Sequence, residues 1–334
     1  MSIGRRSISA GQRHRTQVFV VAQDSSEVGN LVFKINLKHL FSTSPCPSQP
    51  EEKEPHAQPE AVACFKQVDD FERMAFAASP SGDAIVAVNY GGCGRTLIYA
   101  AAAGVSPGPE MRSVKNYLFL VPVLQQQLLP GGGGRWAWSA LPDSPDLARG
   151  QRESVLAYFV AGARIWISLH LQGTYSFDTA RQRWRKEGAW VLPVLGRVVL
   201  VPDFLGSGRR LLFGIRYYDH MFCAVDMDAR PPAVLGSWRE AWPTVGWAAG
   251  YRRCSFIPQV SYFGGGRFCV SMTNQTNEED PRSIVPFKAV ELTADLQLIE
   301  RRSSCYLMPQ SSCGSPVTVI LLASKSWYNI FPPL

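Results

Sequence analysis

A strand–turn–strand unit recurs along this sequence, and the recurrence constrains the fold more than any other feature. In each unit an apolar stretch is followed by a turn that contains Gly or Asp, and then by a second apolar stretch. In the clearest unit, residues 154–179, a third strand "GTYSFDT" follows the pair "SVLAYFV" and "RIWISLH". Other units begin at "QVFVVAQ", "RMAFAAS", "GRVVLVP" and "QVSYFG", and "NYLFLVPVL" is a weaker candidate. Antiparallel units repeated every roughly 50 to 80 residues are typical of the blades of a β-propeller.

Within the units, the residue pattern is that of two-faced β-strands. In residues 164–170, three aliphatic residues alternate with Trp166, Ser168 and His170, which is the period of a strand. The 28 Gly and 24 Pro residues interrupt the chain too often for long helices. We therefore predict an all-β fold over residues 17–309, a propeller of about six antiparallel four-stranded blades, with five blades as the alternative.

Four segments depart from this repeat. Residues 1–16 are rich in Arg and Ser, with no acidic residue before Asp24, and predict a disordered basic leader or, alternatively, an organelle transit peptide. Residues 44–61 are rich in Pro and charged residues and predict a disordered loop. Residues 130–135 predict a Gly-rich flexible connector. Residues 310–334 fit no blade and are expected to form a divergent C-terminal segment.

Composition and charge argue against several classes of protein. Hydrophobic residues make up 46% of the chain and charged residues 18%, which excludes global disorder. The net charge of +7 arises from scattered arginine pairs without a zinc-finger spacing or a basic helix, so nucleic-acid binding is not expected. No stretch approaches the roughly 18 apolar residues of a membrane span. Several of the eight cysteines lie in apolar strands and we find no secretory signal, which favours the cytoplasm or the nucleus.

The residue types that carry enzyme chemistry form no familiar motif here. The five histidines are isolated in the sequence: two lie in segments expected to be disordered (His14 and His56), and three lie elsewhere (His39, His170 and His220). No Cys-x-x-Cys pair, no Gly-x-Ser-x-Gly elbow and no phosphate-binding glycine loop occurs. We therefore predict no catalytic residue, no metal site and no cofactor. One polar and aromatic cluster is a candidate surface site: Tyr217, Tyr218, Asp219 and His220.

The stretch "GTYSFDTARQRW", residues 173–184, resembles the end of a Kelch-type blade, in which an aromatic strand ending in Asp precedes a Trp. More broadly, residues 17–300 resemble a plant family, expanded in grasses, of uncharacterised Kelch-like or galactose-oxidase-like propeller proteins that carry a domain of unknown function. The resemblance implies that the aromatic residues and the Trp pack between blades and that the Asp organises a tight turn. It assigns a structural blade motif to five residues: Tyr175, Phe177, Asp178, Thr179 and Trp184.

The chain departs from the Kelch pattern in its glycines. Apart from the Gly-rich connector at residues 130–135, the double glycine of Kelch repeats is present only at Gly91 and Gly92 and in the run Gly264, Gly265 and Gly266. No leucine- and proline-rich helical segment of the F-box type is found near the N-terminus.

These observations favour a non-enzymatic protein-interaction module that is monomeric and binds an unidentified protein partner through its loops. Two alternatives stay open. The first is a divergent carbohydrate-active or oxidase-type propeller enzyme. The second is an organelle-directed protein associated with nucleic acid.

Overall fold

A computed structural model describes residues 16–24, 29–42, 55–67, 74–78, 84–89, 94–110, 123–128, 134–139, 155–243, 251–253, 258–276, 282–310 and 318–320. The predicted leader lies outside the described residues except for Thr16. Residues 44–54 of the predicted loop and 130–133 of the predicted connector also lie outside them.

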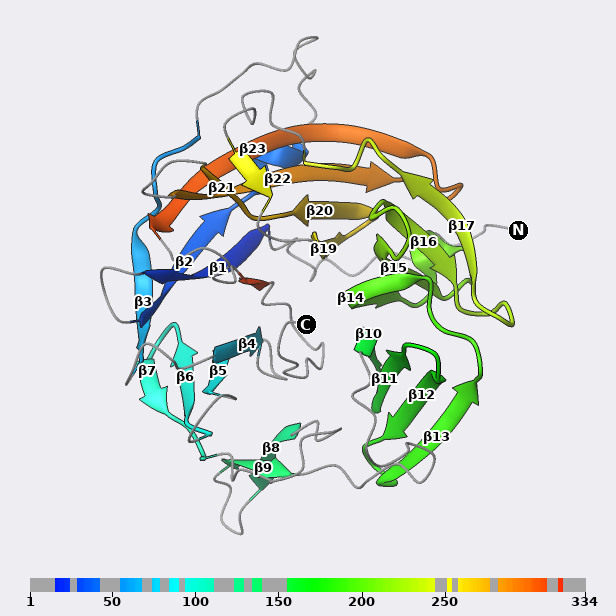
Figure 1. The fold of residues 1–334 in the computed structure, drawn as a ribbon, viewed down its shortest axis with the longest axis horizontal. Helices are drawn as coiled ribbons and strands as arrows, with labels where there is room; N and C mark the ends of the chain where they lie inside the picture. The colour runs from blue at the N-terminus through cyan, green and yellow to red at the C-terminus, as the bar shows by residue number, and fades with distance from the viewer. Residues whose placement is uncertain are drawn as a thin grey trace, which may run out of the picture.

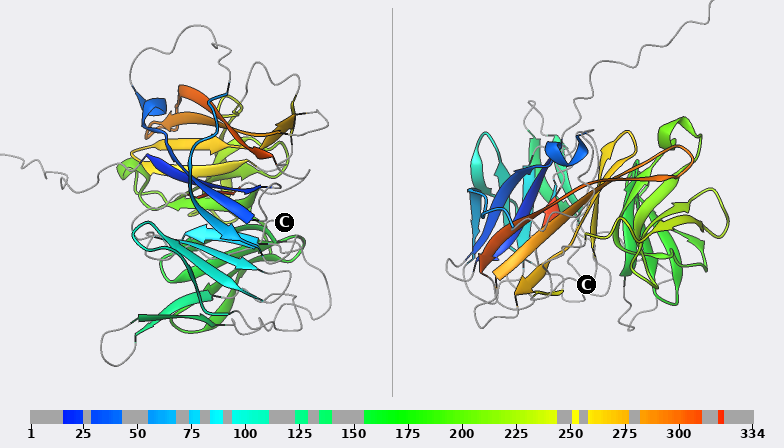
Figure 2. Two further views of the ribbon diagram at one scale, coloured as in Figure 1. Left: turned by 90° about the vertical axis from the view of Figure 1, so that its left-hand side faces the viewer. Right: turned by 90° about the horizontal axis from the view of Figure 1, so that it is seen from above.

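Antiparallel β-sheets stand around a ring in the described part of the chain (Figure 1). The described strands form five hydrogen-bonded sheets, and one of these is an eight-stranded sheet in which a short parallel pairing between β10 (Val155–Ala161) and β14 (Val194–Val201) joins two antiparallel four-stranded units. With those two units counted separately, we number six sheets in chain order. Side views show the sheets standing side by side, with the turns between strands at the two opposite faces of the ring (Figure 2). The prediction of an all-β propeller is therefore confirmed.

The sheets follow one another along the chain. The first contains β1 (Gln17–Asp24), β2 (Gly29–Asn36) and β3 (Ala61–Lys66), with the 3-10 helix η1 (Lys38–Phe41) between β2 and β3. The second contains β4 (Met74–Ala78), β5 (Ala84–Asn89), β6 (Thr96–Ala100) and β7 (Gly104–Pro107), and the third contains β8 (Val123–Leu128) and β9 (Gly134–Ser139).

The fourth sheet contains β10 (Val155–Ala161), β11 (Arg164–Leu169), β12 (Gly173–Asp178) and β13 (Arg183–Gly188). The fifth contains β14 (Val194–Val201), β15 (Leu211–Arg216), β16 (Phe222–Asp226) and β17 (Ala233–Trp238), with η2 (Phe204–Gly206) between β14 and β15. The sixth contains β18 (Tyr251–Arg253), β19 (Gln259–Gly264), β20 (Arg267–Ser271), β21 (Asn274–Thr276), β22 (Arg282–Leu292) and β23 (Leu298–Gln310). Neither described helix, at four and three residues, is long enough to cross a membrane.

The first sheet contains a fourth strand, which comes from a segment that follows the sixth sheet in the sequence. Strand β24 (Thr318–Ile320) pairs with β1, where Val20 lies opposite Val319. Of the predicted divergent C-terminal segment, residues 310–334, the structure describes only residue 310 and residues 318–320, and the latter pair with β1. A three-residue strand carries too little alternation to be identified from sequence, and its partner is fixed only when the ring brings the two ends together. Because this sheet combines the first and the last described strands, its pairing closes the ring.

The core lies between neighbouring sheets, and strand alternation decides which neighbour each side chain contacts. On β1, Val18 and Val20 pack in a cluster with Phe287 of the sixth sheet. Phe19 and Val21 point to the opposite face, where they join a cluster with residues of the second sheet. The fourth and fifth sheets share a cluster of their own, as do the fifth and sixth. Successive side chains of a strand point to opposite faces, so each inner strand contributes to two interfaces.

Candidate functional site

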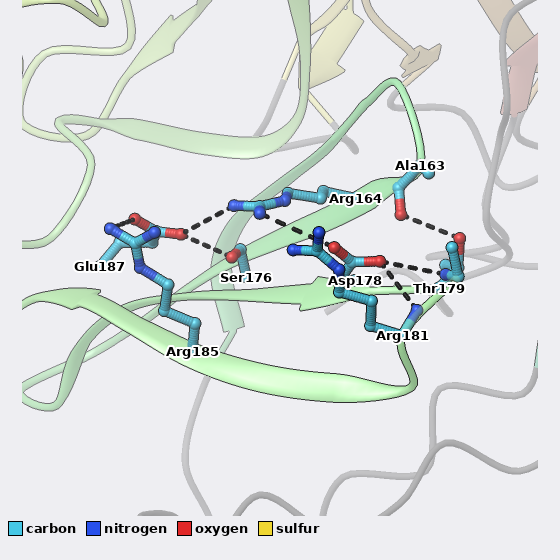
Figure 3. Close-up of polar contacts among 9 residues, drawn as sticks. Ala163, Arg164, Ser176, Asp178, Thr179, Arg181, Arg185 and Glu187 are labelled. Atoms are coloured by element: carbon cyan, nitrogen blue, oxygen red, sulfur yellow. Dashed lines mark hydrogen bonds and ion pairs between the residues drawn. The ribbon is translucent and has the colours of Figure 1, made fainter.

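The predicted blade motif forms a fixed turn between β12 and β13 (Figure 3). Oδ1 of Asp178 accepts hydrogen bonds from the backbone N–H groups of Ala180 at 3.1 Å and Arg181 at 3.0 Å. Both bonds lower the pKa of Asp178 below its ordinary value, and the bond from Arg181 has the largest effect. Thr179 donates from Oγ1 to the carbonyl oxygen of Ala163 at 2.8 Å, which ties this turn to the turn between β10 and β11.

An ion network that the sequence analysis missed lies beside this turn (Figure 3). The side chain of Glu187 is only 7% exposed, and it accepts a hydrogen bond of 2.6 Å from Oγ of Ser176. Arg164 lies 3.8 Å from Glu187 and 3.7 Å from Asp178, and Arg185 lies 3.5 Å from Glu187. A buried carboxylate needs such partners, so loss of one of them would leave the charge of Glu187 less compensated. The only sequence signal was that Ser176 and Asp178 share the polar face of β12.

The aromatic residues of the motif pack within the fourth sheet. Tyr175 and Phe177 are buried, and the ring centroid of Trp184 lies 5.0 Å from that of Phe177. Trp184 is half-buried, whereas the resemblance implied a buried position between sheets. The reason is its place on β13, the outermost strand of the fourth sheet, which β12 alone flanks.

The predicted surface cluster occupies the turn between β15 and β16. Asp219 is held inside this turn, since its carboxylate accepts a 2.8 Å hydrogen bond from Nε of Arg216, a second one from Nη2 of the same residue, and a bond from the backbone of Met221. His220 is half-buried and has a positive φ of 57°. Tyr217 is half-buried, and its ring contacts that of Tyr218, which is 85% exposed. The polar members of the cluster therefore build the turn, and Tyr218 is the side chain presented to solvent.

The linker between β13 and β14 is bonded both to that turn and to the strand ends that flank the turn between β11 and β12. The linker from β13 to β14 is bound at Trp190, whose carbonyl oxygen accepts a 2.9 Å hydrogen bond from Oγ1 of Thr174, and at Leu192, whose N–H donates to Oγ of Ser168 at 2.8 Å. The N–H of Tyr217 donates to the carbonyl oxygen of Pro193 at 3.0 Å. The linker thus joins the turn between β11 and β12 to the turn between β15 and β16.

These three segments present bulky apolar side chains to solvent. Leu171 is 88% exposed and has a φ of 63°, a left-handed conformation that costs a non-glycine residue about 1–2 kcal/mol. Val191 of the linker is also exposed. We name this feature the rim surface and define it by four residues: Leu171, Val191, Tyr217 and Tyr218. The sequence analysis found only its tyrosines, because exposure of Leu171 depends on a turn geometry that the residue type does not favour.

A second feature lies at the junction of the first and sixth sheets, where η1 faces the start of β20. A pocket of about 530 Å³ opens there. Its lining residues are polar, basic and aromatic, and none of them is acidic. We name it the cationic pocket and define it by six of those residues: Asn36, Lys38, His39, Phe41, Ser42 and Arg267.

The histidines fall in three places. His170 is exposed in the turn between β11 and β12, near the rim surface. His39 and His56, isolated in sequence, come together with ring centroids 6.5 Å apart. His56 lies in the loop predicted to be disordered, yet it forms a β-bridge with Tyr306 of β23. Its backbone N–H donates to the carbonyl oxygen of Cys305 at 2.8 Å, and its carbonyl oxygen accepts from the N–H of Leu307 at 3.0 Å. Among the described residues, no three His, Cys, Asp or Glu side chains gather in an arrangement that could hold a metal ion.

Three of the described cysteines are buried free thiols: Cys223, Cys269 and Cys305. Burial raises the pKa of Cys223 and of Cys305 to about 12, and it raises the pKa of Cys269 as well. Because the thiolate is the reactive form, these three side chains act as buried apolar groups.

The ring of sheets defines the chain as a β-propeller protein. The family model described as "Protein of unknown function (DUF1668)" matches residues 15–135 and 125–306, and the chain belongs to this family. No curated protein matches the sequence. Among solved structures, it is similar to the β-propeller domain of Cps50 (Swd1) from Myceliophteria thermophila, with 9% identity, coverage of 71% of this chain and 72% of that one, and a TM-score of 0.25. The Kelch-like assignment and the plant origin stay predictions.

Proposed function

We propose that this protein is a non-enzymatic interaction module that binds a protein partner through the rim surface. The observation that carries the proposal is Leu171, an 88% exposed leucine held in a left-handed conformation at the tip of a turn. Exposure of a large apolar side chain and backbone strain at one residue both cost free energy in the unbound molecule. A partner that covers the side chain recovers the first of these costs.

The rim surface is organised before binding. Ser168 and Thr174, whose hydroxyl oxygens lie 3.1 Å apart, fix the base of the turn that carries Leu171, and both also bond to the linker. Asp219 fixes the turn that carries Tyr218. A surface with fixed loops loses little conformational entropy on association, and exposed tyrosines supply contact area at low entropic cost.

The surface also suggests the chemistry of the partner. The acidic group nearest to Tyr218 in sequence, Asp219, is ion-paired with Arg216, so it presents little net charge. We infer that the partner offers a predominantly apolar patch with a polar border. The free, buried cysteines support a placement of the protein in the cytoplasm or the nucleus.

Affinity purification followed by mass spectrometry tests this proposal. The rim variant combines Leu171→Asn, since Asn tolerates the left-handed conformation, with Tyr218→Ser. The control variant combines Val234→Thr and Leu235→Thr on the outer strand β17, where both apolar side chains are exposed, at 37% and 40%. Melting curves of both variants establish that they fold.

We expect one or more proteins to co-purify with the wild type and the control and to be lost with the rim variant. Recovery of the same proteins with all three chains would overturn the assignment to the rim surface. Recovery of nucleic acid in place of protein would instead favour the alternative of a nucleic-acid-associated protein.

A further inference from the structure

The cationic pocket is built by two segments that are far apart in the sequence and meet at the junction of the first and last sheets. η1 lies at one end of the ring, at the top of the right-hand view in Figure 2. Leu37 and Leu40 are fully buried and anchor this segment, while Lys38 and His39 between them are exposed. The anchors therefore direct the polar side of η1 towards the pocket.

Hydrogen bonds hold η1 in place without a ligand. Oδ1 of Asn36 accepts a bond from the backbone N–H of Lys38 at 3.0 Å and from Oγ1 of the buried Thr16 at 3.1 Å. The backbone N–H of Leu40 donates to the carbonyl oxygen of Leu37 at 3.0 Å. The backbone that carries Lys38 is thus positioned before any ligand arrives.

Arg267 forms the facing wall. Its guanidinium carbon lies 5.6 Å from the centre of the Phe41 ring, and Phe41 packs on Phe263 with ring centroids 5.4 Å apart. Nε of Arg267 donates to the carbonyl oxygen of Gly264 at 3.3 Å. Nη2 of Arg267 is buried and has no hydrogen-bond partner among the described residues. A buried donor without an acceptor is costly, so the guanidinium of Arg267, which lines the pocket, has unused hydrogen-bonding capacity.

Within the described part of the chain, the surroundings of the pocket carry unbalanced positive charge. The described acidic residues of the adjoining strands are already paired, Glu291 with Arg301 and Glu300 with Lys288. Lys38, Arg267 and Arg302 form no ion pair within the described part of the chain. Nε of Arg302 is also buried without a hydrogen-bond partner there.

The positive environment also acts on the pKa of His39. Burial is the main cause that lowers its pKa, a backbone hydrogen bond at Asn36 acts against it, and the charges of His56 and Arg302 lower it further. A neutral imidazole still offers one N–H donor. A ligand with negative charge would therefore meet two cations and a polar ring, and it would meet no carboxylate among the lining residues.

We propose that the cationic pocket binds a phosphate monoester, with the phosphate between Lys38 and Arg267 and the organic part against Phe41. Two cations match a dianion, and the guanidinium fork suits the geometry of phosphate oxygens. The volume of about 530 Å³ exceeds the needs of an inorganic anion and lies in the range of small-ligand sites. The ester is borne either by a free small molecule or by a phosphorylated side chain, and both present the same chemistry. This site is separate from the rim surface.

Isothermal titration calorimetry of the full chain tests the proposal with three probes: inorganic phosphate, phenyl phosphate and a neutral peptide that contains phosphotyrosine. We expect phenyl phosphate to bind more tightly than inorganic phosphate, because its ring contacts Phe41, and we expect affinity to fall as salt is raised. Tighter binding of the peptide than of phenyl phosphate indicates a phosphorylated protein as the source, and the reverse order indicates a small molecule. Absence of saturable binding for all three probes would overturn the proposal.

Variants locate the site. Arg267→Gln is expected to reduce the affinity for phenyl phosphate at least about tenfold, and Arg267→Lys by less, since a charge remains without the fork. Lys38→Gln changes only an exposed side chain, so it tests the pocket even if Arg267→Gln destabilises the fold. Arg209→Gln is the matched control, because Arg209 is an exposed arginine outside the pocket. Equal affinities of wild type, Lys38→Gln and Arg267→Gln would contradict the assignment.

Discussion

Phe177 and Trp184 are register partners on β12 and β13, and their ring centroids lie 5.0 Å apart at an interplanar angle of 53°. Through this contact the outermost strand of the fourth sheet packs on a fully buried aromatic ring. Aromatic pairs across neighbouring strands contribute to sheet stability beyond the backbone hydrogen bonds. The half-buried Trp184 is therefore a structural residue, although its strand lies at the edge.

Trp184→Ala is expected to lower the free energy of unfolding by about 2–3 kcal/mol, less than the loss for a fully buried Trp because part of the ring already faces solvent. Urea denaturation followed by circular dichroism measures the change. Trp184→Phe retains a ring against Phe177 and should lose less than half as much. An unchanged midpoint for Trp184→Ala would show that the contact contributes nothing to stability.

Asp178→Ala should destabilise the turn, whereas Asp178→Asn should largely preserve it, because Asn keeps a side-chain oxygen that accepts from the backbone of Ala180 and Arg181. The pKa of Asp178 is lowered in the folded protein, so the unfolded chain binds more protons in acid. The stabilisation by the charged carboxylate is complete above the ordinary pKa of 3.8 and is lost as the pH falls through the lower folded value. Melting curves from pH 7 to pH 2 should show the wild type and Asp178→Asn converging in acid. A constant difference would contradict this.

Gly266→Ala and Gly265→Ala form a matched pair. Both glycines have positive φ, 75° and 60°, so either substitution incurs backbone strain of about 1 kcal/mol. A Cβ on Gly266 would lie 2.2 Å from the carbonyl oxygen of Leu292, whereas a Cβ on Gly265 would meet nothing within 4 Å. Gly266→Ala should therefore cost at least about 2 kcal/mol more than Gly265→Ala. Equal denaturation midpoints would mean that the turn that carries Gly266 can move away from Leu292 at no measurable cost in stability.

Removal of β24 should weaken the closure of the ring. A chain that ends at residue 310 lacks the three residue pairs between β24 and β1, and we expect a loss of about 2–4 kcal/mol from their backbone hydrogen bonds and packing. A chain that ends at residue 322 keeps β24 and is the control. Calorimetry of the two truncated proteins gives the difference, and identical unfolding temperatures would show that the pairing is dispensable.

Cys223 and Cys305 should resist alkylation in the folded protein. Their pKa values of about 12 leave almost no thiolate at pH 8. Mass spectrometry after brief iodoacetamide treatment should find both unmodified until denaturant is added. Rapid modification of either in the native protein would indicate that its strand opens readily.

Much of the fold could be predicted from local pattern. The alternation in residues 164–170 fixed one apolar face, and the structure buries Ile165, Ile167 and Leu169 on it. The resemblance of residues 173–184 to the end of a Kelch-type blade also implied the turn at Asp178, whose carboxylate accepts from the backbone just beyond the strand. The sequence could not indicate that Trp184 would be half-buried, since that depends on how many strands flank β13.

What the sequence by itself determined was the type of each element: strands with two faces, turns at Gly and Asp, and hence an all-β repeat. Alternation acts between neighbouring residues, so it is legible along the chain. Only the tertiary structure decided that β24 pairs with β1, that Arg267 faces η1, and that Leu171 is displayed beside the linker to β14. The first two of these relations depend on the geometry of a closed ring, in which the curvature and number of sheets determine which distant segments meet. The third depends on how the linker packs on the ends of β11 and β12. No local periodicity in the sequence encodes which distant segments will meet.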